Sequence, residues 1–215
     1  MKLTTYPTDK HKSYIKKITD VCKEKGLTLI LKGSLAKGSG TKYSDIDLIL
    51  LGEVNEAIVN EIILRYGNPI MTNYTENPKG IMILIYNEFV SVDLDIRETL
   101  TNKELRDSII LERRSNIKIS DRICRKSIDT KLIPERPHWY KVLRLVHRSF
   151  IKYLSGKLDE AKNLINEAKE ELLLDKTTYY KDYCTDIRNI YQHFIDNFPI
   201  PLEINVLFEN LFKAL

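Results

Sequence analysis

The sequence predicts an α/β unit with a mixed sheet over residues 1–98, followed by an all-helical unit over residues 99–215. Two observations lead to this division. In the first half, short apolar runs of strand length alternate with amphipathic segments of helical length. From about residue 100 onward, apolar residues recur mainly at helical spacing. A chain of 215 residues fits one large domain or two small ones, so two units are compatible with the length.

The elements of the first half follow from apolar periodicity and from the residues that stop it. Gly26 and Gly67 each end a helical pattern, and Asn87-Glu88 separates two apolar runs as a hairpin turn would. The predicted order is a helix, two buried strands, a helix, a weaker strand and a hairpin, at residues 8–25, 27–32, 44–51, 53–66, 70–74, 81–86 and 89–96.

The second half predicts helices joined by short connections. Thr101 and Glu104 fit a capping box, which predicts a helix to about Arg114. Residues 115–135 show no clear period and lead into a linker near Pro134 and Pro137. The remaining helices are expected at residues 139–154, 158–174, 179–197 and from Pro201 onward.

Composition excludes several classes of protein. No apolar run approaches the roughly 18–20 residues that a membrane helix requires, and the first residues lack the apolar stretch of a signal peptide. Three scattered cysteines, Cys22, Cys124 and Cys184, predict reduced core thiols. We therefore expect a cytoplasmic protein with no membrane partner.

Charge is unevenly distributed along the chain. Residues 1–102 are balanced, whereas residues 103–152 carry 14 basic and 6 acidic side chains. Such a basic segment could face a phosphate-rich ligand, and it could equally be the solvated surface of a helix.

The most informative stretch runs from Leu31 to Leu48. An apolar strand ends in Gly33-Ser34, and a loop then leads to Asp45-Ile46-Asp47 at the head of a second strand. Alternation along a strand places Asp45 and Asp47 on one face, where two close carboxylates repel each other unless a cation lies between them. Gly33 allows the backbone to approach a phosphate, and Ser34 offers its hydroxyl and its amide.

A third carboxylate is available on a later strand. Asp93 and Asp95 share one face of residues 90–96, while the intervening apolar residues face the core. A carboxylate there could bind a metal ion that activates an acceptor hydroxyl, and could accept its proton.

These motifs together resemble the DNA polymerase β-type nucleotidyltransferase superfamily: Gly-Ser, a loop, Asp-x-Asp and a third acid on a neighbouring strand. The resemblance covers about residues 31–96. It implies a nucleotidyltransferase core that transfers a nucleoside monophosphate from a nucleoside triphosphate, such as ATP, to a hydroxyl acceptor, releasing pyrophosphate. The implied cofactors are two Mg²⁺ ions, for which Mn²⁺ can substitute.

The resemblance also implies residue roles. Asp45, Asp47 and Asp93 are the expected catalytic and metal-binding acids, and Asp93 is preferred to Asp95 because Val-Asp-Leu looks more like the family's third-acid strand. Asp95 stays in the expected metal set. The expected nucleotide-binding residues are Gly33, Ser34, Lys37, Ser44, Lys141 and Arg144; the last two share one helix face with Arg148.

The acceptor stays open at this stage: RNA or tRNA, a protein, or an antibiotic-like small molecule. An alternative function is a catalytically silent nucleotide-binding or antitoxin-like module of a toxin–antitoxin or defence system. Arg188 and His193 resemble the Arg-x4-His signature of HEPN domains, although ordinary helix-surface residues explain that spacing as well.

Overall fold

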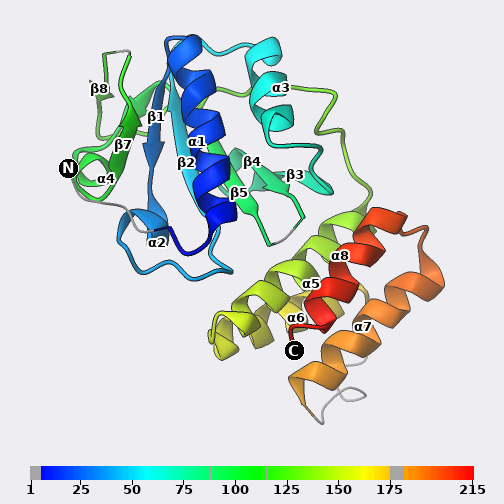
Figure 1. Cartoon of the computed structure of the whole chain (residues 1–215). Coiled ribbons are helices and arrows are strands. Elements are labelled where there is room, and N and C mark those ends of the chain that lie inside the picture. Colours follow the sequence, from blue (N-terminus) through cyan, green and yellow to red (C-terminus); the bar gives the residue numbers. More distant parts are fainter. Residues whose placement is uncertain (1–5, 88, 115, 175–181) are drawn as a thin grey trace. The chain divides into compact units, whose positions relative to one another are not determined.

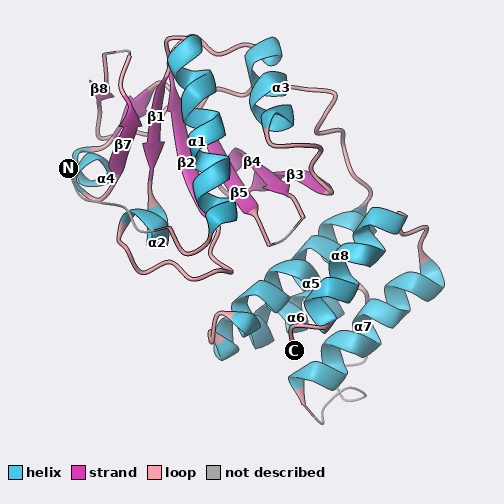
Figure 2. Ribbon diagram, in the orientation of Figure 1, coloured by secondary structure: helices cyan, strands magenta, loops and turns pink. Residues whose placement is uncertain are grey.

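The computed structural model of the chain describes residues 6–87, 89–114, 116–174 and 182–215. The chain divides into two compact units, Met1–Pro134 and Glu135–Leu215 (Figure 1). The first contains all of the described strands and the second only helices (Figure 2). The α/β core and the helical C-terminal part are thus confirmed. Two predicted features, Glu88 in the hairpin turn and the helix start at Tyr179, lie outside the described residues.

A six-stranded mixed sheet forms the centre of the first unit. Its strand order is β3-β4-β5-β2-β1-β7, and only the pair β2 and β5 is parallel. The strands are β1 (Thr28–Leu31), β2 (Ile46–Leu51), β3 (Met71–Glu76), β4 (Lys79–Ile85), β5 (Ser91–Arg97) and β7 (Ile109–Glu112). This arrangement puts β2, which carries Asp47, beside β5, which carries Asp93 and Asp95, in the middle of the sheet.

Helices α1 (Asp9–Glu24) and α3 (Glu56–Arg65) cover one face of this sheet (Figure 1). Each has the side-chain N-cap its sequence offers, Thr8 for α1 and Asn55 for α3. The buried core beneath them takes alternate residues of the central strands, among them Leu48 and Leu50. The other alternate residues therefore face away from these two helices.

A second segment covers part of the opposite face. It consists of β6 (Thr99–Leu100), α4 (Asn102–Arg106) and β8 (Lys118–Ile119), and β6 pairs with β8. Leu105 and Ile117 pack there against a small apolar cluster of Ile30, Ile49, Leu51 and Leu100.

The predicted helix from Thr101 to Arg114 is therefore wrong in its length. The capping box forms as predicted, but α4 ends at Arg106 and the chain re-enters the sheet as β7 beside β1. Burial of a strand against the sheet edge outweighs the helical pattern of residues 107–112.

Residues 113–134 also belong to the first unit. Thr72 and Tyr74 on the edge strand β3 donate side-chain hydrogen bonds to the carbonyls of Leu132, at 3.2 Å, and Ile128, at 2.9 Å. Ile133 is buried in the core beneath α1 and α3. The structural boundary thus follows Pro134, whereas the sequence predicts one after residue 98.

Four helices make up the described part of the second unit: α5 (His138–Leu154), α6 (Leu158–Glu171), α7 (Tyr183–Asn197) and α8 (Leu202–Phe212). Their apolar faces meet in an aromatic core in which Tyr191 stacks on Phe208 with ring centroids 4.3 Å apart. Lys169 and Asp186 form a buried ion pair at 3.0 Å.

The three cysteines are free thiols, as predicted, but only Cys22 is buried; Cys184 is half-buried and Cys124 is exposed. Within the described ranges, no helix has the length and apolar character needed to cross a membrane.

Candidate active site

Two of the predicted acids, Asp47 on β2 and Asp93 on β5, lie directly opposite each other. The strands are parallel, and their register pairs Asp47 with Asp93. Paired positions on adjacent strands lie roughly 5 Å apart, and both side chains leave the sheet on the face away from α1 and α3. Both residues are half-buried. The structure thereby brings together residues 46 positions apart in the chain.

Gly33 holds the backbone of the preceding loop against Asp47. The amide of Lys32 donates to the carbonyl of Asp47 at 2.9 Å, which continues the β1–β2 pairing by one residue. Gly33 then turns away with φ +70°, and a Cβ atom built on it would lie 1.9 Å from Oδ2 of Asp47. A group bound at the Gly33-Ser34 backbone therefore lies next to this carboxylate.

The loop from Gly33 to Ser44 begins with the short helix α2 (Gly33–Ala36) and is tied back on itself. The carbonyl of Ser34 accepts from the amide of Ser39 at 3.0 Å, and Gly40 passes so close to buried Leu35 that a Cβ would lie 2.3 Å from its Cδ2. Lys37 follows α2 and is exposed. These contacts give the loop a defined path between the two strands.

Ser44 closes this loop. Its hydroxyl accepts from the amide of Thr41 at 2.9 Å, and its own amide donates to the carbonyl of Thr41 at 3.0 Å. The Ser44 side chain, predicted to bind nucleotide, is thus used for the turn that leads into Asp45.

Asp45 lies just before β2, which begins at Ile46, and is half-buried. Strand alternation therefore does not fix its direction as it does for Asp47.

A neighbour absent from the sequence-based site is His11 on α1. His11 is buried, and its Nε2 lies 3.0 Å from the carbonyl oxygen of Ser44. The sequence signals His11 in one way: it is a polar residue at helical spacing from Tyr14, Ile15 and Ile18, on the apolar face of the predicted helix.

Asp95 has a different environment from Asp93, although alternation puts both on one face. It is fully buried, and Arg97 donates to its Oδ2 from Nε at 2.7 Å. The Nε atom of Arg125 lies 3.1 Å from its Oδ1. Two guanidinium groups thus bind the Asp95 carboxylate, whereas Asp93 is half-buried and lies opposite Asp47.

Glu104 extends the same ion-pair network. It accepts from Nη1 of Arg97 at 2.5 Å and caps α4 through Thr101. Burial opposes ionisation of Glu104, but hydrogen bonds from Arg97 and Thr101 outweigh it and lower the pKa of this carboxyl. The network ties β5 to α4 and to the segment that carries Arg125.

Lys141 and Arg144 lie on α5 of the second unit, both half-buried, so the geometry of the first unit does not include them. On α7, the guanidinium of Arg188 stacks over Phe212 at 4.8 Å, and His193 contacts Asn197 one turn later at 3.3 Å. These packing contacts agree with the ordinary helix-surface explanation of the Arg-x4-His spacing.

Side chains alone do not form a complete metal cage in the described part of the chain. Among the residues that the structure describes, no three His, Cys, Asp or Glu side chains gather closely enough to hold a metal ion by themselves. Mg²⁺ in nucleotide-dependent enzymes is commonly held by one or two carboxylates together with phosphate oxygens and water. The pair Asp47 and Asp93, with the close backbone of Gly33 beside it, fits such a shared site.

Comparison with known proteins defines the class. A nucleotidyltransferase domain family matches residues 15–124, which is just over half of the chain and includes Gly33, Asp47 and Asp93. The chain belongs to this nucleotidyltransferase family, which confirms the resemblance seen in the sequence. Among curated protein sequences, none matches the chain significantly.

Several solved structures resemble the chain at low identity. The Thermotoga maritima CCA-adding enzyme complexed with tRNA is 14% identical, with a TM-score of 0.36 over 99% of this chain. The STING-associated CdnE c-di-GMP synthase from Capnocytophaga granulosa is 12% identical, with a TM-score of 0.31; the match covers 96% of this chain and 82% of that one. The chain spans 58% of the length of the CCA-adding enzyme.

Proposed function

We propose that the protein transfers a nucleoside monophosphate from a nucleoside triphosphate, such as ATP, to a hydroxyl acceptor. One observation carries the proposal: the Gly33 backbone lies against the Asp47 carboxylate, which is paired in register with Asp93. A triphosphate held at Gly33-Ser34 is thereby placed beside two acids. Lys37, exposed after α2, adds positive charge near the phosphates.

In the proposed reaction, the acceptor oxygen forms a bond to the α-phosphorus while the bond from that phosphorus to the β-phosphate oxygen breaks, and pyrophosphate leaves. Asp93 accepts the proton of the attacking hydroxyl. Asp45, Asp47 and Asp93 would hold two Mg²⁺ ions, which would supply positive charge to stabilise the attacking and leaving oxygens. Asp95 is left out of this set because Arg97 and Arg125 occupy it.

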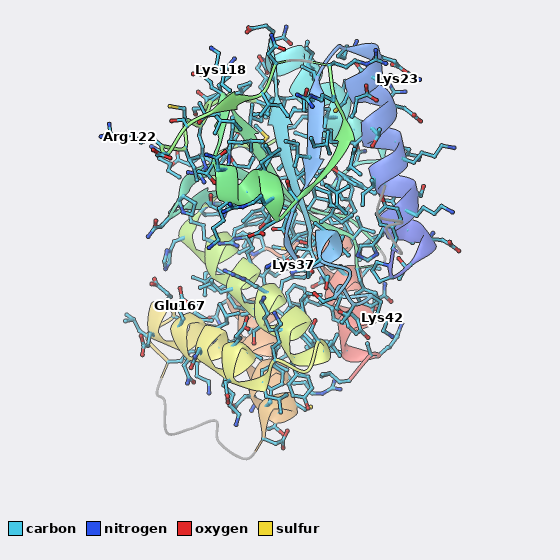
Figure 3. All side chains as sticks on the ribbon, turned by 90° about the vertical axis from the view of Figure 1, so that its left-hand side faces the viewer. Lys23, Lys37, Lys42, Lys118, Arg122 and Glu167 are labelled. Atoms are coloured by element: carbon cyan, nitrogen blue, oxygen red, sulfur yellow. The ribbon has the colours of Figure 1, made fainter. Side chains whose placement is uncertain are left out.

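The charge layout favours an acceptor that carries phosphate, such as RNA. Five exposed basic side chains in the segment 103–126 form no ion pair with another described residue: Lys103, Arg106, Arg113, Lys118 and Arg122. Lys118 and Arg122 project outward from the first unit (Figure 3). Exposed lysine and arginine without acidic partners are the usual contacts to a phosphate backbone.

The test is incubation of the purified protein with each α-³²P-labelled nucleoside triphosphate, Mg²⁺, and either RNA or a panel of hydroxyl-bearing small molecules. We expect label in an acceptor fraction. Asp47→Asn should reduce the transfer by more than the roughly 100-fold that loss of a metal-supporting partner can cost. Asp20→Asn, an exposed aspartate on α1, is the matched control and should transfer normally.

Equal transfer by Asp47→Asn and Asp20→Asn would exclude the proposed metal-dependent site. Nucleotide binding by the wild-type protein with no labelled product from any acceptor would support the alternative, a silent nucleotide-binding module.

A further inference from the structure

His11 is the polar exception on the apolar face of α1. It is 1% exposed, and the same face buries Tyr14, Ile15 and Ile18 in the core. A buried imidazole is costly unless both ring nitrogens find partners. Both do: Nδ1 lies 2.7 Å from Oγ1 of Thr8, and Nε2 lies 3.0 Å from the carbonyl oxygen of Ser44.

These contacts determine which ring nitrogen carries the hydrogen in the neutral imidazole. The Ser44 carbonyl can only accept, so Nε2 must donate to it. In the neutral ring, Nδ1 then accepts from the Thr8 hydroxyl, whose oxygen also caps α1 by accepting from the His11 amide at 3.3 Å. Burial lowers the pKa of His11, against the opposing influence of the Ser44 carbonyl and the Asp45 carboxylate. Because Nε2 carries a hydrogen in the neutral and in the charged ring, the bond to Ser44 persists across this titration.

Asp45 needs an anchor of this kind, whereas Asp47 does not. Asp47 is held on both sides by neighbouring strands, through the register with β5 and the hydrogen bond from Lys32. Asp45 precedes the first residue of β2 and follows a loop that contains Gly38 and Gly40. The hydrogen bond from His11 to the Ser44 carbonyl holds in place the peptide group that joins Ser44 to Asp45.

We propose that His11 is a positioning residue: it fixes the Ser44–Asp45 peptide to α1 and so holds the Asp45 carboxylate in place to bind metal together with Asp47. This inference rests on the proposed function, because it assigns Asp45 to the same metal site. His11 itself contacts neither the metal ion nor the nucleotide.

Two substitutions separate the hydrogen bond from the space the ring fills. In His11→Gln, the amide reaches the level of Nε2 and can still donate to Ser44. In His11→Asn, the shorter side chain places its amide where Nδ1 of the imidazole lies. It therefore keeps the hydrogen bond with Thr8 and loses the one to the Ser44 carbonyl. The readouts are the melting temperature, the affinity for Mn²⁺ by electron paramagnetic resonance with a non-hydrolysable ATP analogue, and the Mg²⁺ dependence of transfer.

Loss of a partner that orients a metal ligand typically costs about 10–100-fold in metal affinity. We expect His11→Asn to weaken Mn²⁺ binding by roughly 10-fold or more and to raise the Mg²⁺ concentration for half-maximal transfer by a similar factor. His11→Gln should stay within about 3-fold of wild type, because its hydrogen bond to Ser44 is retained. Equal Mn²⁺ affinities in the two variants, whether both normal or both weak, would overturn the inference.

Combining His11→Asn with Asp45→Asn tests whether His11 affects Mn²⁺ affinity through Asp45. If His11 acts through Asp45, His11→Asn has no further effect on Mn²⁺ affinity once Asp45 is neutral; an undiminished effect would overturn the inference. Should His11→Asn fail to fold, Thr8→Val serves as the second variant, because it removes the hydroxyl that orients the ring. Thr8→Val should weaken Mn²⁺ binding in the protein that keeps Asp45 and leave it unchanged in the Asp45→Asn variant. Absence of transfer by the wild-type protein, with the Mn²⁺ results as expected, would count against the proposed function alone.

Discussion

Gly33 is subject to two separate constraints, and each would exclude a side chain. Its φ of +70° lies in the region that L-residues other than glycine rarely adopt, and the space a Cβ would need is taken by the Asp47 carboxylate. The φ constraint arises from the local backbone, and the steric constraint arises from the neighbouring Asp47 side chain. A glycine of this kind marks a place where the backbone passes directly beside a carboxylate.

Gly33→Ala should therefore strongly reduce activity by displacing Asp47. Adopting φ +70° with a Cβ costs about 1–2 kcal/mol of stability, and the contact with Asp47 adds to that cost. We expect transfer to fall by roughly 100-fold or more, because displacement of a reacting group by about 1 Å has an effect of that size. Labelled transfer and urea denaturation measure the two effects.

Gly38 provides the matched control. Its φ is +73°, nearly that of Gly33, but a Cβ there meets nothing within 4 Å. Gly38→Ala should lose the same roughly 1–2 kcal/mol of stability and keep most of its activity. If the two alanine variants lost activity equally, backbone strain and not the contact with Asp47 would be the cause.

At the scale of one strand, β5 carries two aspartates with opposite roles. Asp93 is half-buried and faces Asp47, whereas Asp95 is fully buried between Arg97 and Arg125. Alternation predicts their shared face but not this difference, because the arginine partner Arg125 comes from a distant segment of the chain.

Asp95→Asn should destabilise the first unit by about 3 kcal/mol or more, because it removes the fully buried one of the two carboxylates that pair with the buried Arg97. The half-exposed pair of Glu61 and Arg65 is the control, and Glu61→Gln should cost about 1 kcal/mol or less. Urea denaturation followed by circular dichroism compares the two. A cost for Asp95→Asn no larger than for Glu61→Gln would contradict a structural role for the network.

Helix α5 carries a buried titratable group. Burial, with a smaller contribution from Arg144, lowers the pKa of His147 from 6.5 to about 4. When pH falls, the unfolded chain takes up a proton at this residue before the folded chain does, so the second unit loses stability between pH 6.5 and 4. For a group with these pKa values the loss from pH 7 to pH 5 is about 2 kcal/mol.

Trp139 is the only tryptophan and stacks on Phe198 within the second unit, so its fluorescence reports unfolding of that unit. Urea denaturation at pH 7 and pH 5 should give a stability difference about 2 kcal/mol larger for the wild type than for His147→Gln. The same pH dependence in both proteins would show that His147 does not contribute.

For the whole molecule, the boundary after Pro134 has a testable consequence. A fragment of residues 1–98 lacks β7, the edge partner of β1, and the segment that covers Ile30, Ile49 and Leu51. An uncovered apolar face and an open sheet edge promote aggregation. We expect residues 1–134 to unfold cooperatively and residues 1–98 to aggregate or to bind a hydrophobic dye. Equal cooperativity of the two fragments would place the boundary earlier.

The sequence by itself determined the class of fold, the order of most elements and the core motif. Gly33, Asp45 and Asp47 lie within 15 residues of one another, and apolar periodicity marks the strands that carry them. Such signals are local, and a single chain read in order can show them. The prediction of a helix over residues 107–112 was wrong because pairing with the sheet edge outweighs the helical pattern there.

Only the tertiary structure decided which residues share the site. The pairing of Asp47 with Asp93, the occupation of Asp95 by two arginines, and the bond from His11 to Ser44 all join segments far apart in the chain. They depend on strand register and on buried polar groups finding partners, and neither leaves a periodic mark in the sequence. The sequence thus supplied the carboxylates, and the packing of the first unit decided which of them lie side by side.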